Sequence, residues 1–307
     1  MTHNYIGVDL SKEWLDIYNP ESGFARIRNT EAELRGFLRG LGARDFLIFE
    51  ATSLCDGPIL RCASAAQVPF HRLNPLHGWH FSRSLNLPKT DRVDAWMLAR
   101  MGAERRLERS APLDPERAEL AELNTRRDQL KRMETQEKNR LGKTVSSAVK
   151  ADIRATLRML ARRIARIEAG ITGFLRARPE CARAVALLES IPGVGRVTSV
   201  TLLSAMPELG QCDRRAIASL GGLAPKARES GKWRGHRAIG QGRRHVRRAL
   251  YMAALSALRH RSFCTPWVRA LREKGKPGKV IAIAVARKIL TIANAVLRDQ
   301  TPFKAPV

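Results

Sequence analysis

Two extended apolar runs open the chain, and the first of them carries an acid. Residues 5–10 read YIGVDL, and residues 14–18 form the second run. β-Branched and aromatic residues of this kind are typical of strands rather than helices. Gly7 lets another segment approach the first strand closely. Asp9 would lie on a rigid strand, which suits a metal ligand, although an exposed aspartate at a strand end would explain this residue taken alone.

Residues 1–110 alternate strand and helix signals. We expect further strands at residues 24–27, 45–50 and 68–73. Helices are expected from Thr30 to about residue 41, after Pro58, from Asn74-Pro75 onward, and over residues 91–101. Thr30 and Glu33 have the spacing of a capping box, and Thr90 is a further N-cap. Three strands followed by alternating strands and helices predict a mixed sheet with helices packed on it.

Four acids recur at the ends of these elements. Glu50 ends a strand, and Asp91 and Asp94 share one face of a helix because they are three residues apart. Carboxylates that converge with Asp9 would repel one another, so such a cluster persists most readily around a divalent cation. Oxygen ligands suit Mg²⁺ or Mn²⁺, which can assist phosphoryl transfer. As an alternative, Asp91 is only an acid favoured by the helix dipole.

Basic residues concentrate beyond residue 110. The net charge is +26: residues 1–110 hold 15 Lys and Arg against 13 Asp and Glu, whereas residues 111–307 hold 40 against 16. A polyanion is the expected partner of the second part, because neutralising phosphates releases counterions; a generically basic soluble protein is the alternative. Five cysteines form no CxxC pair, which favours a reducing cytoplasm. We expect no signal peptide and no membrane-spanning run.

Residues 111–178 carry a heptad pattern. Apolar residues recur at spacings of four and three through Ile153, Leu157, Leu160, Ile164, Ile167, Ile171 and Phe174. A weaker stripe lies in the charged stretch 116–136. The pattern predicts a helical hairpin or a coiled coil that packs against itself or against a second subunit. Arginines on the outer face, such as Arg162 and Arg166, are more often solvated than bound to phosphate.

Residues 179–307 predict an all-α domain with two basic features. The turn Gly193-Val194-Gly195-Arg196 is similar to that of helix-hairpin-helix modules, in which backbone N–H groups meet a phosphate; a plain tight turn is the alternative. Residues 226–248 hold nine Lys and Arg and one acid. The candidate nucleic-acid contacts in this stretch are Lys226, Arg228, Lys232, Trp233, Arg234, Arg237, Arg243, Arg244, Arg247 and Arg248. Trp233 can stack on a base. Helices are expected at residues 197–206, 243–259 and 280–297, and a further helix is expected to begin at residue 267. The arginines of the helix at residues 243–259 are expected to be exposed.

Three stretches together resemble a known family. Ile6-Gly7-Val8-Asp9, Phe49-Glu50-Ala51-Thr52 and residues 89–95 (KTDRVDA) closely resemble the RuvC-like domain of the DEDD recombinases. This is the IS one-ten family of insertion sequences, which also includes the Piv-type DNA invertases. The C-terminal part is similar to its transposase domain at Gly222–Pro225, Ser230-Gly231, Gly242–Arg248 and Leu250-Tyr251.

The resemblance implies an α/β RNase H-like (RuvC-like) domain at 1–110, coiled-coil helices at 111–178, and an all-α transposase domain at 179–307 with a helix-hairpin-helix-like turn. It implies Mg²⁺ held by Asp9, Glu50, Asp91 and Asp94. Ser230, by itself most simply a turn residue, becomes the nucleophile that attacks DNA and is held transiently as a phosphoserine. The acids and the serine of one site would come from different subunits of a homodimer or tetramer.

We therefore expect a cytoplasmic, nucleoid-associated recombinase of an insertion sequence that acts on donor and target DNA. The resemblance further implies a noncoding bridge RNA that pairs with both DNAs, so that RNA rather than protein reads the sequence. Three alternatives stay open: a Piv-type invertase without a guide RNA, a metal-dependent junction nuclease that does not need Ser230, and a non-catalytic nucleic-acid scaffold.

Overall fold

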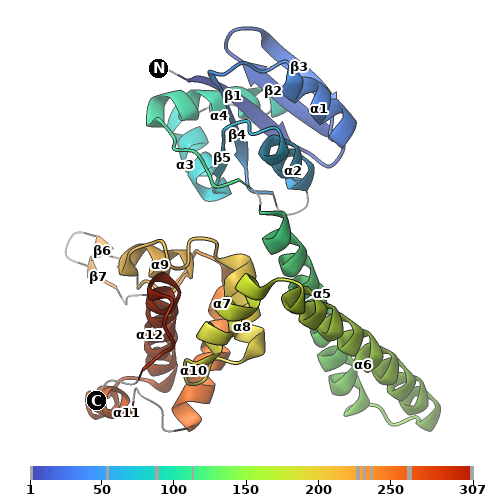
Figure 1. The fold of residues 1–307 in the computed structure, drawn as a ribbon, viewed down its shortest axis with the longest axis vertical. Coiled ribbons are helices and arrows are strands. Elements are labelled where there is room, and N and C mark those ends of the chain that lie inside the picture. Colours follow the sequence, from blue (N-terminus) through green and yellow to red (C-terminus); the bar gives the residue numbers. More distant parts are fainter. Residues whose placement is uncertain are drawn as a thin grey trace. The chain divides into compact units, whose positions relative to one another are not determined.

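A computed structural model describes residues 3–52, 55–86, 90–112, 114–225, 229–230, 233–235, 238–260 and 265–304. The chain divides into two compact units, Met1–Pro115 and Glu116–Val307 (Figure 1). Each unit has its own hydrophobic core. The middle helices belong to the same unit as the C-terminal helices. The division into three segments at residues 110 and 178 stays a prediction.

The first unit is built on a mixed sheet of five strands. These are β1 (Asn4–Leu10), β2 (Trp14–Asn19), β3 (Gly23–Arg28), β4 (Asp45–Glu50) and β5 (Phe70–Leu73). Their order is β3-β2-β1-β4-β5, with β1, β4 and β5 parallel to one another and β2 and β3 antiparallel to their neighbours. The predicted mixed sheet is confirmed, and it is compatible with the RNase H-like fold that the resemblance implies. β5 begins two residues later than expected, after Pro69, which has no N–H for the ladder.

Helices cover both faces of this sheet. They are α1 (Glu31–Arg39), α2 (Gly57–Ala65), α3 (Pro75–Leu85) and α4 (Asp91–Arg105). Alternate residues of β1 face opposite sides: Ile6 and Val8 are buried in the core that includes residues of α1 and α2, whereas the opposite face packs against α3 and α4. The predicted N-caps Thr30 and Thr90 are confirmed, since each accepts a hydrogen bond from a backbone N–H of the first turn. Asn74 caps α3 in the same way.

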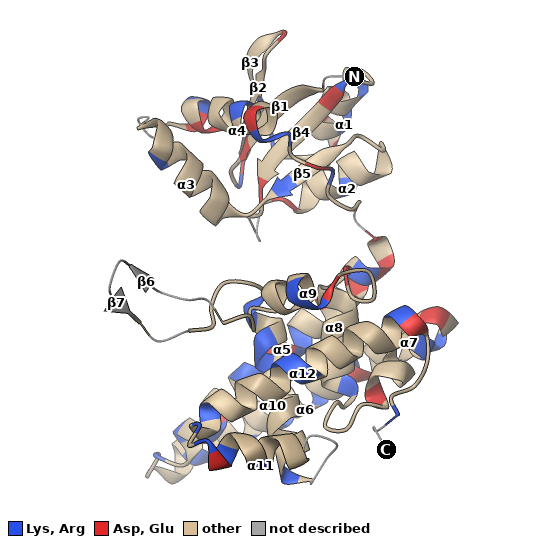
Figure 2. Ribbon diagram, turned by 90° about the vertical axis from the view of Figure 1, so that its left-hand side faces the viewer, with Lys and Arg blue, Asp and Glu red and all other residues tan. Residues whose placement is uncertain are grey.

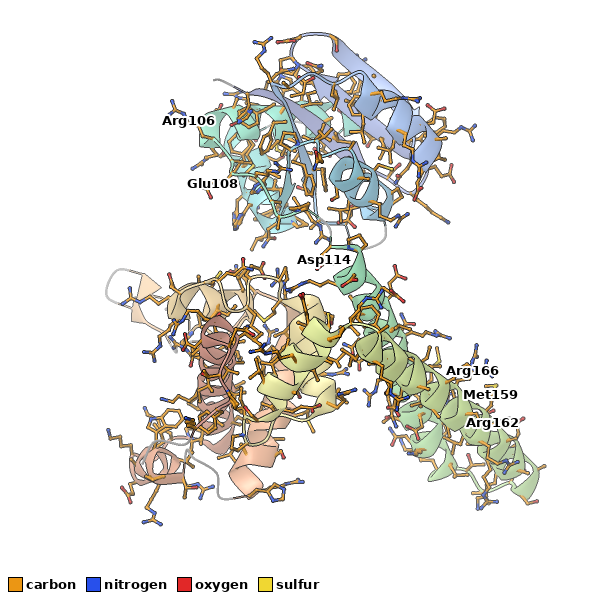
Figure 3. The ribbon with its side chains drawn as sticks, viewed as in Figure 1. Arg106, Glu108, Asp114, Met159, Arg162 and Arg166 are labelled. Carbon is orange, nitrogen blue, oxygen red and sulfur yellow. The ribbon has the colours of Figure 1, made fainter. Side chains whose placement is uncertain are left out.

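The second unit begins with two long helices. These are α5 (Pro115–Leu141) and α6 (Ser147–Arg176), which are joined by a short turn and packed side by side. Leu130 of α5 meets Leu160 and Ile164 of the predicted heptad pattern, so the helical hairpin is confirmed, while a supercoiled arrangement stays a prediction. Figure 3 shows Met159, Arg162 and Arg166 pointing away from α5, as expected of the solvated face.

The remaining elements form a bundle around one buried helix. They are α7 (Pro179–Glu189), α8 (Arg196–Ala205), α9 (Arg214–Leu220), β6 (Glu229–Ser230), β7 (Trp233–Arg234), α10 (Arg244–Arg259), α11 (Thr265–Glu273) and α12 (Gly278–Asp299). The predicted helices are confirmed. α12 contacts α7, α9, α10 and α11, and its core residues include Val285, Ile289 and Ala293.

α12 corrects one expectation from the sequence. It is long and apolar enough to cross a membrane by length and composition, the one such helix among the described residues, although no such run was expected. Half of its apolar window is buried inside the bundle, and the core helix of a helical bundle must be apolar around most of its circumference. Its composition is therefore explained by packing.

α4 lies directly on β1 at Gly7. A Cβ atom at Gly7 would lie 1.9 Å from the carbonyl oxygen of Ala95 and 2.6 Å from the backbone nitrogen of Ala99. No side chain fits in that space, so the glycine sets the distance between helix and sheet.

We expect Gly7→Ala to lower the free energy of unfolding by about 3 kcal/mol, because α4 must move away from the sheet. Gly36 of α1 is the matched control: it is exposed, and a Cβ there meets nothing within 4 Å. Gly36→Ala should stabilise the protein by about 0.5–1 kcal/mol. Urea unfolding of both variants measures the difference, and equal stability of Gly7→Ala and wild type would contradict this packing.

Candidate functional site

The close contact between α4 and β1 brings three predicted acids together. Ala95 and Ala99 lie over Gly7, and the first turn of α4, which carries Asp91 and Asp94, continues toward Asp9. The negative charges of Asp94 and Asp91 both act on the Asp9 carboxyl. Burial, then Asp94, then Asp91 raise the pKa of Asp9 from 3.8 to about 6, against a hydrogen bond from the backbone of Leu10 that lowers it.

Glu50 lies at the same edge of the sheet. β4 runs parallel to β1 with Val8 beside Phe49, so Glu50 follows at the position next to Asp9 and faces the same side of the sheet. Its carboxylate occupies the space left by Gly78 of α3, where a Cβ would lie 2.0 Å from Glu50 Oε1. All four predicted acids therefore belong to the end of the sheet where β1 and β4 finish.

These residues are suited to a divalent cation. A cation would relieve the repulsion that raises the pKa of Asp9, and the donors are hard carboxylate oxygens of the type that Mg²⁺ and Mn²⁺ prefer. As placed, the described side chains contain no group of three or more His, Cys, Asp or Glu that encloses a metal position. Asp9, Glu50, Asp91 and Asp94 are the residues that would hold the ion.

Sequence reasoning missed a fifth acid and its arginine. Asp16 of β2 lies directly opposite Asp9 in the antiparallel pair and is only 4% exposed. Arg26 of β3 binds Asp16 through two hydrogen bonds of 2.9 Å and reaches Asp91 at 3.2 Å. Its contacts with Asp16, and then with Asp91, raise the pKa of Arg26. This arginine therefore links a buried acid beside Asp9 to the first turn of α4. Only the register of β1 on β2, which the sequence does not specify, brings Asp16 to the site.

Ser230 lies in a short hairpin. β6 and β7 pair antiparallel, with Ser230 opposite Trp233. The side chains of Ser230, Trp233 and Arg234 lie outside the described part of the chain. Lys226, Arg228, Lys232 and Arg237 lie outside the described residues.

The two ends of the segment that carries Ser230 are held together by tightly packed backbone. Gly222 and Gly242 both have a positive φ, and a Cβ at Gly242 would lie 2.4 Å from the backbone nitrogen of Gly222. Arg247 donates to the carbonyl oxygens of Gln241 (2.7 Å) and Gly222 (3.4 Å). Residues 222 and 242 are thus clamped at the base of the segment.

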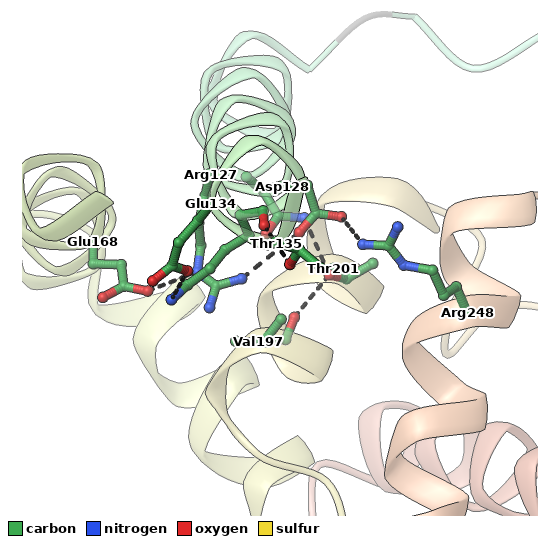
Figure 4. Close-up of polar contacts among 10 residues, drawn as sticks. Arg127, Asp128, Glu134, Thr135, Glu168, Val197, Thr201 and Arg248 are labelled. Carbon is green, nitrogen blue, oxygen red and sulfur yellow. Dashed lines mark hydrogen bonds and ion pairs between the residues drawn. The ribbon is translucent and has the colours of Figure 1, made fainter. Parts of the chain in front are cut away.

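The arginines at the start of α10, from its N-cap Arg243 onward, make internal contacts that the sequence did not predict. Arg243 forms two 2.6 Å hydrogen bonds with Glu208, and Arg248 forms an ion pair of 3.0 Å with Asp128 of α5 (Figure 4). The prediction that all four are exposed is wrong for Arg243 and Arg247, which are half-buried. Acids or carbonyl oxygens of the same unit are the partners of Arg243, Arg247 and Arg248. Arg244 is exposed and has no partner among the described residues.

The two predicted glycines of the turn before α8 have different surroundings. Gly193 has φ +88°, and a Cβ there would lie 2.6 Å from the carbonyl oxygen of Ala253 in α10. Gly195 and Arg196 are exposed at the start of α8, and Arg196 lies 3.8 Å from Glu189. Gly193 is therefore explained by packing, whereas Gly195 and Arg196 are accessible to a ligand.

We expect Gly193→Ala to lower the free energy of unfolding by at least about 2 kcal/mol, from backbone strain and overpacking against α10. A Cβ at Gly195 meets nothing within 4 Å, so Gly195→Ala should change it by less than about 1 kcal/mol. Thermal unfolding of the two variants compares them. Similar losses in both would show that the turn is not packed in this way.

The pKa of Asp9 predicts a pH-dependent stability in metal-free protein. Its folded pKa of about 6 exceeds the ordinary value of 3.8, so the folded state holds more protons between these pH values. The stability that the protonated carboxyl contributes is fully present below pH 3.8 and is lost as the pH rises through about 6. We therefore expect Asp9→Asn to be more stable than wild type above about pH 7, by about 1–2 kcal/mol after allowance for partial exposure.

Urea unfolding in EDTA between about pH 4 and pH 8 measures this difference, which should vanish at the acidic end. Glu104→Gln is the control in the same unit, on α4, since Glu104 forms an exposed ion pair with Arg100. It should change stability by less than about 0.5 kcal/mol at every pH. An Asp9→Asn variant that is less stable than wild type at pH 7 would show that the carboxylates are not close.

Two family models match the chain. A DEDD transposase model of the IS110 type matches residues 6–149, and the model described as the transposase IS116/IS110/IS902 family matches residues 185–271. Pilin gene-inverting proteins of Moraxella bovis and Moraxella lacunata are each 30% identical, over 99% of this chain and 98% of the relative. The uncharacterized 43.6 kDa protein of insertion element IS110 from Streptomyces coelicolor is 29% identical over 45% of this chain and 34% of its own length.

Proposed function

The chain belongs to the IS116/IS110/IS902 family of transposases, and on this premise we propose that it is a Mg²⁺-assisted serine recombinase. Family membership confirms the resemblance found in the sequence and implies DNA cutting and rejoining, with DNA as substrate. One observation carries the more specific proposal: burial of the Asp9 carboxyl, together with the nearby charges of Asp94 and Asp91, raises the pKa of Asp9 to about 6.

The acidic cluster would act on the scissile phosphate. Asp9, Glu50, Asp91 and Asp94 would hold Mg²⁺ or Mn²⁺, which supplies positive charge that offsets the charge on a phosphate under attack. Arg26 would keep Asp91 oriented through its contacts with Asp16 and Asp91. Asp9, Asp91 and Asp94 lie on a strand and a helix whose spacing Gly7 sets, and Glu50 lies on the neighbouring strand; such elements give the rigid support that phosphoryl transfer requires.

Ser230 would be the nucleophile. Its Oγ would attack the scissile phosphorus and displace a deoxyribose oxygen, which leaves as a hydroxyl, and a phosphoserine would form. Attack by the hydroxyl of another DNA end on this phosphoserine would release Ser230 and rejoin the DNA. The acids of one subunit and Ser230 of another would form one site in a dimer or tetramer, as the resemblance implies.

The source of sequence specificity separates two versions of this function. A bridge RNA, implied by the resemblance, would pair with donor and target DNA in an insertion-sequence recombinase. Site-specific inversion without a guide RNA is the second candidate, which the full-length similarity to pilin gene-inverting proteins favours. Sequencing of any RNA that copurifies with the protein distinguishes them.

We expect a covalent protein–DNA adduct when the protein is incubated with donor and target DNA, flanking-locus RNA and Mg²⁺. Ser230→Ala should abolish the adduct. Asp9→Asn should slow its formation by at least about 100-fold, because the phosphate loses charge stabilisation. Denaturing gels with labelled DNA measure both effects.

Ser219→Ala is the matched control, because Ser219 is an exposed serine in the same unit, and it should form the adduct normally. Cut DNA without an adduct in wild type and in Ser230→Ala would overturn the serine mechanism in favour of a metal-dependent nuclease. Unchanged cutting in Asp9→Asn would remove the acids from catalysis.

A further inference from the structure

A large groove in the second unit has no role in the function described so far. It lies along α12 between α9 and α11 and has a volume of about 820 Å³. Leu223 and Ile239, which flank the segment carrying Ser230, line it together with Ile283 of α12. A cavity of this size and apolar character is typical of sites that enclose a small organic group.

The rim of the groove is strongly basic. Five cationic side chains line it, and no Asp or Glu is among its described lining residues. They are Arg214 and Arg215 of α9 and Lys279, Arg287 and Lys288 of α12. None of the five side chains forms an ion pair or hydrogen bond with a described residue, unlike Arg243 and Arg248. Figure 2 shows basic residues on both α9 and α12.

An exposed tryptophan completes the groove. Trp267 of α11 lines it and is 40% exposed, although a tryptophan in a helical bundle is normally buried by its own fold. An aromatic ring beside unpaired cations is the combination that binds single-stranded nucleic acid, in which bases stack on rings and phosphates meet Lys and Arg.

We propose that this groove binds a single strand of nucleic acid, with an unstacked base on Trp267 and the apolar floor and with phosphates along the rim of α9 and α12. A second copy of this chain is disfavoured as the occupant, because the unit around the groove carries most of the net charge of +26 and would repel itself. A duplex is disfavoured because its bases are stacked inside and cannot reach an apolar floor.

The groove lies beside the segment that carries Ser230. Leu223 and Pro225 precede the segment with Ser230, and Ile239 follows it. A strand held in the groove therefore passes the base of that segment. The relation of the bound strand to Ser230 rests on the proposed function, whereas strand binding itself does not.

The test is fluorescence anisotropy with labelled 20-nucleotide probes of one sequence, as single-stranded DNA, single-stranded RNA and duplex DNA. Lys279→Glu with Lys288→Glu changes two exposed rim residues. It should weaken single-strand binding about 10-fold and reduce the salt dependence, the slope of log affinity against log salt, by about 1.4. Trp267→Ala should weaken it about 10-fold as well, while Trp267→Phe should retain most of the affinity.

Arg269→Glu with Arg272→Glu is the matched control, because it makes the same change of charge at exposed positions of α11 outside the groove. It should leave the single-strand affinity within about 3-fold of wild type. A 5-iodouracil probe crosslinked by light should be recovered on Trp267 by mass spectrometry. The strand, DNA or RNA, that loses more affinity in Trp267→Ala identifies the natural occupant.

An equal loss in the control and groove variants, an equal loss for duplex and single strand, or unchanged binding in Trp267→Ala would each overturn the proposal. Circular dichroism confirms that each variant is folded. Because binding is measured without cleavage, a protein that forms no Ser230 adduct can still pass this test, so the two proposals fail separately.

Discussion

The contact of α4 with β1 at Gly7 is the constraint on which the first unit depends. The backbone of α4 lies where a side chain would otherwise project from the strand, so helix and sheet can approach no more closely and the first turn of α4 faces Asp9. This packing places like charges together at a cost. The raised pKa of Asp9 reflects that cost, because burial, and then repulsion by Asp94 and Asp91, disfavours its ionised form. A protein retains such an arrangement when a bound cation or a reaction makes use of it.

Asp16 and Arg26 show how the fold limits this repulsion. Asp16 is buried beside Asp9 and contributes to raising its pKa, and a buried carboxylate without a partner would be strongly destabilising. Arg26 supplies that partner and at the same time contacts Asp91. One guanidinium therefore connects β2, β3 and the first turn of α4.

The basic side chains of the second unit fall into two groups: some bind acids and carbonyl oxygens of the unit itself, and others are available to a substrate. Arg243, Arg247 and Arg248 bind acids and carbonyl oxygens within the bundle, which clamps the base of the segment with Ser230 and fixes α10 to α5. The cations around the groove of α9, α11 and α12 have no described partner. Net charge alone cannot separate these two groups, because an arginine contributes the same charge whether it faces an internal carboxylate or a phosphate.

The sequence by itself determined the secondary structure, the mixed sheet, the family and the uneven distribution of charge, because hydrophobic periodicity, capping residues and local motifs are short-range properties of the chain. It also identified Asp9, Glu50, Asp91 and Asp94 as candidate ligands, and their joint role at a metal stays a prediction, although the charges of Asp91 and Asp94 act on Asp9. Only the tertiary structure decided that Asp16 lies beside Asp9, that Gly193 is a packing residue, that Arg243 and Arg247 are internal, and that Trp267 lines a basic groove. Each of these depends on strand register or on contacts between helices distant in sequence, and such contacts arise from the packing of whole elements rather than from any local pattern.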